Sequence, residues 1–134
     1  MAWAAEPLAE ILLLDQFTRN IFRGTPRAFA GDARALALAR GLVARGDDAR
    51  LDPVQRPFAY LPFEHAEDMA CQDEAVRLFT ALAADPRFAD MLDYAHRHRD
   101  VIRRFGRFPH RNPILGRASS ADELAYLATP GAGF

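Results

Sequence analysis

The residues best suited to hold a ligand lie in one stretch near the end of the chain, residues 105–117, with the sequence FGRFPHRNPILGR. Gly106 can adopt the left-handed conformation that ends a helix, and Pro109 and Pro113 each fix one backbone angle. A loop stiffened in this way holds guanidinium groups in place at low entropic cost, as a pre-formed anion site requires. The candidate ligand-binding residues of this loop are Arg107, Arg111, Asn112 and Arg117.

A histidine lies between two of these arginines, and the unperturbed pKa of that side chain is near neutrality. His110 is therefore a candidate general acid or base. A structural role for the loop stays open, because its arginines could equally cap helix ends and pair with buried carboxylates. Asn112 precedes Pro113, which disfavours the helical region, so we expect an extended backbone at Asn112.

A second polar segment covers residues 14–23, LDQFTRNIFR. Asp15 and Arg19 are four residues apart on the same predicted helix and can pair. Because Asp15 follows four aliphatic residues, we expect it to be half-buried and to need a partner. The candidate ligand-binding residues here are Asp15, Arg19, Asn20 and Arg23, and an ion pair that only holds the arginine loop is the alternative.

The third segment covers residues 61–68, LPFEHAED. His65 is a second candidate catalytic residue, since a three-residue step to Asp68 makes an acid–base pair possible, and Glu67 is a candidate ligand-binding residue. No second histidine follows at the spacing of a helical zinc motif. His96 and His98 point to opposite sides of a helix. We therefore predict no metal and no cofactor.

Length and composition limit the number of domains and the classes of partner. The chain has 134 residues, long enough for one domain over residues 1–134 but too short for two. All 17 basic residues are arginine and the net charge is −1, which argues against nucleic acid as a partner. No run reaches the ~18 apolar residues of a membrane span. The first residues contain no basic stretch before an apolar one, so we expect no secretory signal. The lone Cys71 reads as a packing residue, and we expect a soluble, cytoplasmic protein.

Hydrophobic periodicity is helical throughout and predicts an all-α fold. Short turns between the helices favour antiparallel helical hairpins. We expect about six helices, over residues 7–20, 33–45, 53–69, 72–84, 87–104 and 121–128.

Several residues define these helices more closely. The first should turn an apolar stripe of Leu14, Phe17 and Ile21 towards the core. Asp32 can cap the second helix, and Pro62 should kink the third. The sixth begins with a capping box, in which Ser120 is followed three residues later by Glu123.

Together the three segments resemble the signature blocks of the bacterial family catalogued as domain of unknown function 924, from about Trp3 to Phe134. The resemblance implies a tetratricopeptide-like helical fold and no established activity. Members of that family usually carry a further N-terminal segment rich in Trp and Phe. We therefore expect a chain truncated relative to the family, either because it is a fragment or because its start was misassigned. In both cases the first helix should expose part of its Leu14, Phe17 and Ile21 stripe.

The three segments predict one Arg/His polar cluster. We expect a binding module for a peptide or a small anionic ligand. One alternative is a hydrolase or transferase acting on a phosphorylated or carboxylated small molecule, with His65 or His110 as general acid or base and Arg19, Arg107 and Arg111 binding the anion. The other is a purely structural cluster. An open pocket with unpaired arginines would favour a site, whereas complete pairing would favour structure.

Overall fold

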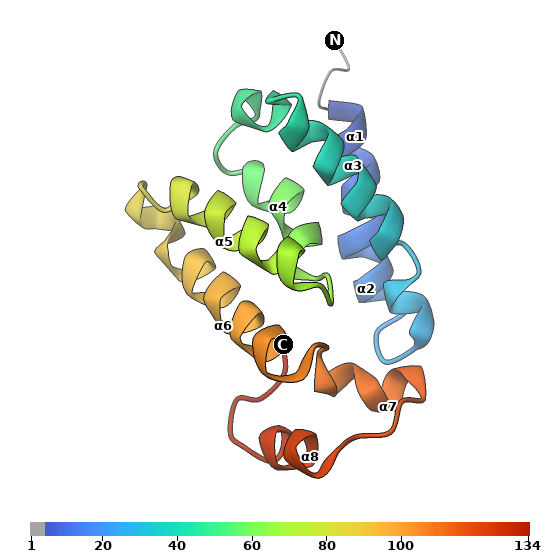
Figure 1. Cartoon of the computed structure of the whole chain (residues 1–134). Coiled ribbons are helices and arrows are strands. Elements are labelled where there is room, and N and C mark those ends of the chain that lie inside the picture. Colours follow the sequence, from blue (N-terminus) through green and yellow to red (C-terminus); the bar gives the residue numbers. More distant parts are fainter. Residues whose placement is uncertain (1–4) are drawn as a thin grey trace.

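The computed structural model describes residues 5–134, and this part of the chain consists of helices and connecting turns without a strand (Figure 1). The all-α prediction is confirmed. Residues 1–4, which the predicted domain and the family resemblance from Trp3 include, lie outside the described part. None of the described helices is both long and apolar enough to cross a membrane.

The first helical segment comprises α1 (Ala5–Ile11), a π-helical turn (Leu12–Phe17) and α2 (Thr18–Ile21). The π-helical turn was not predicted. The longer helices that follow correspond to the predicted ones and are α3 (Asp32–Ala44), α4 (Arg56–Glu64), α5 (Met69–Leu82), α6 (Ala89–Phe105) and α8 (Ala121–Leu127).

The arginine loop is more ordered than the sequence suggests. It contains a 3-10 turn (Pro109–Arg111) followed directly by the short helix α7 (Asn112–Leu115). Asn112 has φ −56° and ψ −50°, so the predicted extended backbone is wrong. Its side chain is completely buried and hydrogen-bonded on both ends, which outweighs the steric preference imposed by Pro113.

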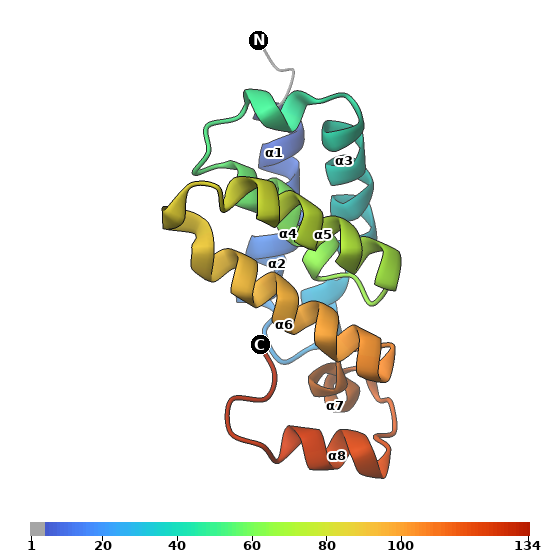
Figure 2. The same cartoon turned by 60° about the vertical axis from the view of Figure 1, so that its left-hand side comes forward.

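Consecutive helices pack on one another. α3 contacts both α1 and α4, α5 lies between α4 and α6, and α8 contacts the 3-10 turn of the arginine loop at one end of the molecule (Figures 1 and 2). Most of the core lies among α1, α3, α4 and α5, with Ile11, Leu42 and Phe79 almost completely buried. A smaller cluster around Phe108 joins the loop to α6, and burial of such a side chain stabilises the fold by about 2–3 kcal/mol. The tetratricopeptide-like arrangement stays a prediction.

The predicted stripe of the first helix does not face this core. Phe17 is 53% and Ile21 69% exposed, whereas Leu8, Ile11 and Asp15 are buried. The first helical segment carries apolar residues on more than one face. The rest of the helical bundle packs on the face that also carries the Asp15 carboxylate. Part of the Leu14, Phe17 and Ile21 stripe is thus exposed.

The start of α3 also differs from the prediction. Gly31 occupies the cap position, and Asp32 makes no cap hydrogen bond but pairs with Arg19 instead. A Cβ at Gly31 would lie 2.5 Å from the Leu14 carbonyl oxygen, so only glycine allows this close approach. The approach brings Asp32 next to the first helical segment.

The third predicted helix is shorter than expected, because α4 begins at Arg56 and ends at Glu64. Pro62 lies inside it, two residues before its end. Asp68 then caps α5, accepting a hydrogen bond from the Cys71 backbone N–H. The capping box of Ser120 and Glu123 is present at α8 as predicted, and Cys71 is buried.

Candidate anion-binding site

The three polar segments meet at a pocket of about 470 Å³. Arg19 and Asn20 of α2 and the nearby Arg23 contribute from one side, and His65 follows the end of α4. His110 and Arg111 come from the arginine loop. The apolar part of the lining comes from Phe29, Phe108, Ile114 and Phe134.

Asp15 is the most deeply buried carboxylate of this cluster, with 1% of its surface exposed. It accepts hydrogen bonds from Arg19 Nη1, His65 Nδ1 and Gln16 Nε2, each at 2.7 Å. Burial raises the pKa of Asp15, but the hydrogen bond and charge of His65 and the charge of Arg19 outweigh burial, so the pKa falls below its ordinary value. Asp15 is therefore ionised at neutral pH.

This contact fixes the orientation of His65. Because the ionised Asp15 only accepts hydrogen bonds, Nδ1 of His65 carries a proton and donates it to Asp15, so in the tautomer without a second ring proton Nε2 is an acceptor. Within residues 5–134, no group hydrogen-bonds Nε2, and the His65 ring lines the pocket. Asp68 does not pair with His65, so the suggested acid–base pair of these two residues is wrong.

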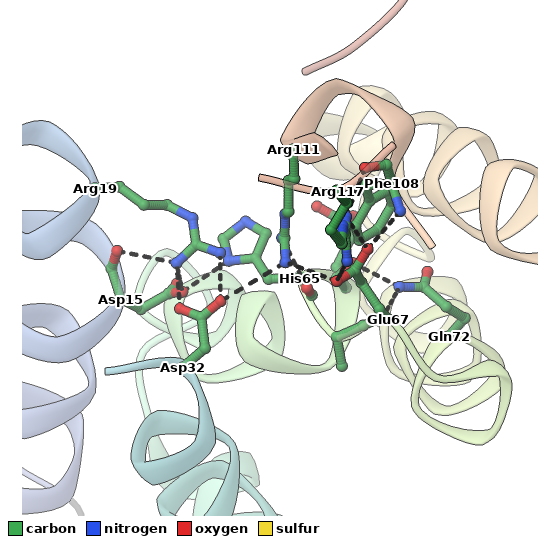
Figure 3. A network of polar contacts seen from close by, with 11 residues as sticks. Asp15, Arg19, Asp32, His65, Glu67, Gln72, Phe108, Arg111 and Arg117 are labelled. Carbon is green, nitrogen blue, oxygen red and sulfur yellow. Dashed lines mark hydrogen bonds and ion pairs between the residues drawn. The ribbon is translucent and has the colours of Figure 1, made fainter. Parts of the chain in front are cut away.

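The backbone around His65 is held from two sides. Arg111 Nη2 donates to the His65 carbonyl at 2.9 Å. Gln72, fully buried on α5, donates to the carbonyls of Glu64 at 2.6 Å and Ala66 at 2.8 Å. The turn that carries the histidine is therefore tied both to the arginine loop and to α5 (Figure 3).

The two terminal nitrogens of Arg19 bind carboxylates. They bind Asp15 at 2.7 Å and both oxygens of Asp32, at 2.7 and 2.9 Å. A bidentate pair of this type is geometrically specific. Arg19 therefore joins α2 to α3 and holds Asp15 in position.

Arg117 forms a second bidentate pair, with Glu67, at 2.9 and 3.0 Å. Glu67 also accepts from the Phe108 backbone N–H at 2.6 Å, and Arg117 donates to the Phe108 carbonyl. Burial raises the pKa of Glu67, but these donors and the charge of Arg111 outweigh it and lower the pKa. This pair fastens the loop to the turn between α4 and α5.

Arg111 differs from both, because it is buried without a close carboxylate. Only 7% of the residue is exposed, and its guanidinium lies between the rings of Phe29 and Phe108, at 4.5 and 4.7 Å from their centroids. The nearest carboxylate oxygens, of Asp32 and Glu67, are both 3.9 Å away. Its Nε atom is buried and has no hydrogen-bond partner in the described chain.

The pKa values of Arg111 and His110 reflect their burial. Burial and the positive charge of Arg19 lower the pKa of Arg111 to about 10, so the guanidinium is still charged at neutral pH. Burial and the charge of Arg111 lower the pKa of His110 to about 4, so His110 is neutral. The Nδ1 atom of His110 is also buried, with no partner among the described residues.

Two candidates of the loop lie away from the pocket. Arg107 pairs bidentately with Glu123 of α8 at 2.8 and 2.9 Å. Asn112 donates to Ser119 and Glu123 and accepts from Arg117. The hydrogen bond from Arg107 holds the pKa of Glu123 well below its usual range. This network joins α8 to the loop.

Asn20 and Arg23 lie at the rim of the pocket and do not join the buried cluster. Both are exposed, and a hydrogen bond of 3.4 Å runs from Arg23 Nη2 to Asn20 Oδ1. The structure therefore brings Asp15, Arg19, His65, Glu67, His110, Arg111 and Arg117 together, leaves Asn20 and Arg23 at the rim, and separates Arg107 and Asn112 from the pocket.

Residues 2–131 match the family described as "Bacterial protein of unknown function (DUF924)". This chain belongs to the DUF924 family. It is similar to a solved structure, the protein of unknown function ATU0120 from Agrobacterium tumefaciens, with 46% identity and a TM-score of 0.84. The similarity covers 91% of this chain and 66% of that chain, so this chain spans slightly less than two thirds of its length. A search of curated proteins found no match.

Sequence reasoning missed several residues of the site in this DUF924 member. Phe29 and Phe134 line the pocket, but nothing in their sequence surroundings distinguishes them from core residues. His98 stacks on Phe134 with 3.6 Å between centroids, and burial lowers its pKa to about 3. Glu64, beside His98, has its pKa raised to about 8 by burial and by the charge of Asp15. Only Glu64 carried a signal, since it lies in the third polar segment.

Two other pockets have comparable volume but different chemistry. One, of about 450 Å³, contains Arg40, Cys71 and Glu74, and burial raises the pKa of the Cys71 thiol. The other, of about 510 Å³, surrounds the paired Arg107 and Glu123. Neither contains an underpaired buried cation, and no group of three or more potential metal ligands occurs within residues 5–134.

Proposed function

We propose that this chain is a helical binding module for a small anionic ligand, a carboxylate or phosphate attached to an apolar group. The observation that carries the proposal is Arg111. A buried guanidinium whose nearest carboxylates are 3.9 Å away is incompletely neutralised. Such a charge costs several kcal/mol of desolvation that a bound anion would offset.

The other arginines supply the contrast. Arg19 and Arg117 each make two short hydrogen bonds to a carboxylate and so have a structural role. Their pairs also occupy Asp32 and Glu67, the only acids near Arg111 for which a contact is seen in the described chain. In this proposal Arg19 and Arg117 therefore stabilise the fold, and Arg111 is the buried arginine available to a ligand.

The dimensions favour a small ligand over a peptide. A volume of about 470 Å³ falls in the range of small-molecule pockets, roughly 300–1,000 Å³. Phe29, Phe108 and Ile114 supply an apolar wall beside the cation. The proposal includes no cofactor, no nucleic acid and no membrane as a partner.

The alternative that the whole cluster is structural has one specific observation in its favour. Glu67 is held by Arg117 and by the Phe108 backbone, so these contacts fasten the loop to the bundle. An experiment therefore has to separate ligand binding from loop stability.

A thermal-shift titration with benzoate and phenyl phosphate tests the proposal. A ligand at 100 times its Kd stabilises the folded state by about 2.7 kcal/mol, which raises Tm by about 8 °C in a chain of this size. Arg111→Met should abolish the shift, Arg111→Lys should retain part of it, and Arg103→Met, at an exposed position on α6, should leave it unchanged. Wild-type protein without any shift, or an equal shift in Arg111→Met, would contradict the proposal.

A further inference from the structure

We propose that this pocket is also a hydrolytic site, in which Asp15 orients His65 as the general base that activates water against an ester carrying a carboxylate group. The inference rests on the proposed function, because Arg111 would bind that carboxylate. It adds a reaction, a base and a substrate class to the binding site.

The first observation is the state of the Asp15–His65 pair. Asp15 is 1% exposed, has three donors around its carboxylate and lies 2.7 Å from Nδ1 of His65. A buried carboxylate in this position fixes one tautomer of the imidazole and stabilises the imidazolium that forms when Nε2 takes a proton. Nε2 makes no hydrogen bond in the described chain and belongs to a residue that lines the pocket, so we take it as the basic atom.

The second observation is that the base and the anion anchor are attached to each other. Arg111 Nη2 donates to the backbone carbonyl of His65, so the guanidinium is tied to the turn that carries the imidazole (Figure 3). Figure 3 shows His65 between Arg19 and Arg111. Because Arg19 is neutralised by two carboxylates and Arg23 is exposed at the rim, Arg111 is the buried cation that would select the substrate. A substrate held at Arg111 would present its ester at a reproducible position relative to His65.

The step balances without a cofactor. Nε2 of His65 takes a proton from water while the water oxygen bonds to the ester carbonyl carbon, giving a tetrahedral oxyanion. The bond from this carbon to the leaving oxygen then breaks, and the imidazolium returns its proton to the leaving alkoxide. One water is consumed, and a carboxylic acid and an alcohol are released.

The test uses the whole chain and two esters, mono-para-nitrophenyl glutarate, which carries a carboxylate, and para-nitrophenyl butyrate, which carries none. We expect a kcat/KM at least about tenfold higher for the glutarate ester. His65→Asn should lower kcat roughly 100-fold while glutarate still binds, and His65→Gln serves if the first variant does not fold. His96→Asn, on α6 and outside the pocket lining, is the matched control and should keep full activity.

Asp15 is a positioning residue in this scheme. Asp15→Asn should lower kcat with little change in KM, and Asp15→Glu should restore part of the loss, which a merely structural role would not produce. Undiminished kcat in His65→Asn, or glutarate binding with no turnover of its ester by the wild type, would overturn the inference and leave the proposed function standing. Wild-type protein that binds none of benzoate, phenyl phosphate and glutarate would overturn both.

Discussion

His65 Nδ1 and Asp15 Oδ1 lie 2.7 Å apart, although 50 positions separate the two residues in the sequence. The contact joins the π-helical turn of the first helical segment to the end of α4. Arg111 adds the arginine loop by donating to the carbonyl of the same histidine. Three segments distant in the sequence therefore meet at His65, where contacts that stabilise the fold lie beside groups that a ligand could bind.

Arg117→Met should destabilise the protein substantially. The substitution removes the hydrogen bonds of Arg117 to Asn112 and to the Phe108 carbonyl, together with the two of 2.9 and 3.0 Å to Glu67. The half-buried Glu67 is left with only the Phe108 N–H and the distant Arg111 among the described residues. We expect a loss of about 2 kcal/mol in the free energy of unfolding, measured by urea denaturation, because a partly buried carboxylate loses its cation. Arg103→Met removes an exposed pair with Asp100 and should change stability by less than about 0.5 kcal/mol. Equal effects of the two variants would argue against a stabilising role of the Arg117–Glu67 pair.

Glu64→Gln should reverse the stability order of wild type and variant as the pH rises. Burial raises the pKa of Glu64 from 4.5 to about 8 in the folded chain. A raised carboxyl pKa means that the folded state binds the proton more tightly than the unfolded state. The stabilisation that this proton gives the folded state is therefore complete below pH 4.5 and is lost as the pH rises to about 8. Above pH 8 the buried carboxylate costs about 3–5 kcal/mol relative to a neutral side chain.

The measurement is the free energy of unfolding of both proteins from pH 5 to pH 9. The difference between variant and wild type isolates Glu64 from His98 and His110, whose lowered pKa values act in the opposite direction. Those two histidines are neutral in the folded state, so their contribution is present above pH 6.5 and is lost as the pH falls towards 3 or 4. A pH-independent difference between the two proteins would show that Glu64 has an ordinary pKa.

The sequence predicted the helices well because their signals are local. The capping box of Ser120 and Glu123 lies within four consecutive residues, and α8 starts where it indicates. The face of the first helix could not be predicted in the same way, since Leu14, Phe17 and Ile21 are as apolar as the residues that are buried. Which face is used depends on α3 and α4, which pack on it from elsewhere in the chain.

The sequence predicted which segments form the candidate site, but it predicted only some of the pairs of side chains that contact each other there. Spacing placed Asp15 and Arg19 on one face and predicted their ion pair, which the structure contains. Spacing also suggested Asp68 as the partner of His65, whereas the partner is Asp15. Asp32 was missed because an aspartate before a helix has a local explanation as a cap. Its role as the partner of Arg19 depends on the close approach of Gly31 to Leu14, which no local pattern encodes.

Anion binding should tighten as the pH falls from 7.5 to 5. His110 lines the pocket, and burial together with the charge of Arg111 lowers its pKa to about 4. A bound anion offsets the charge of Arg111 and favours the imidazolium, so the pKa of His110 rises in the complex and binding takes up a proton. Benzenesulfonate, whose charge is constant over this range, should show a lower Kd at pH 5 than at pH 7.5 by calorimetry. His110→Phe should remove the pH dependence, and a persistent dependence in that variant would assign the proton to another group.

Arg111→Met should abolish anion binding with little or no loss of stability. The methionine keeps an unbranched apolar stem between Phe29 and Phe108 and removes a buried charge. Among residues 5–134, the only close hydrogen bond of that charge is to the His65 carbonyl. Asp32 and Glu67 keep their bidentate arginine partners, so no carboxylate is left alone. We expect a change within about 1 kcal/mol in urea denaturation, of either sign, because removing the cation also removes its desolvation penalty. A loss as large as that of Arg117→Met would instead show that Arg111, like Arg117, holds the loop to the bundle. The pocket would then lose the residue on which its proposed function depends.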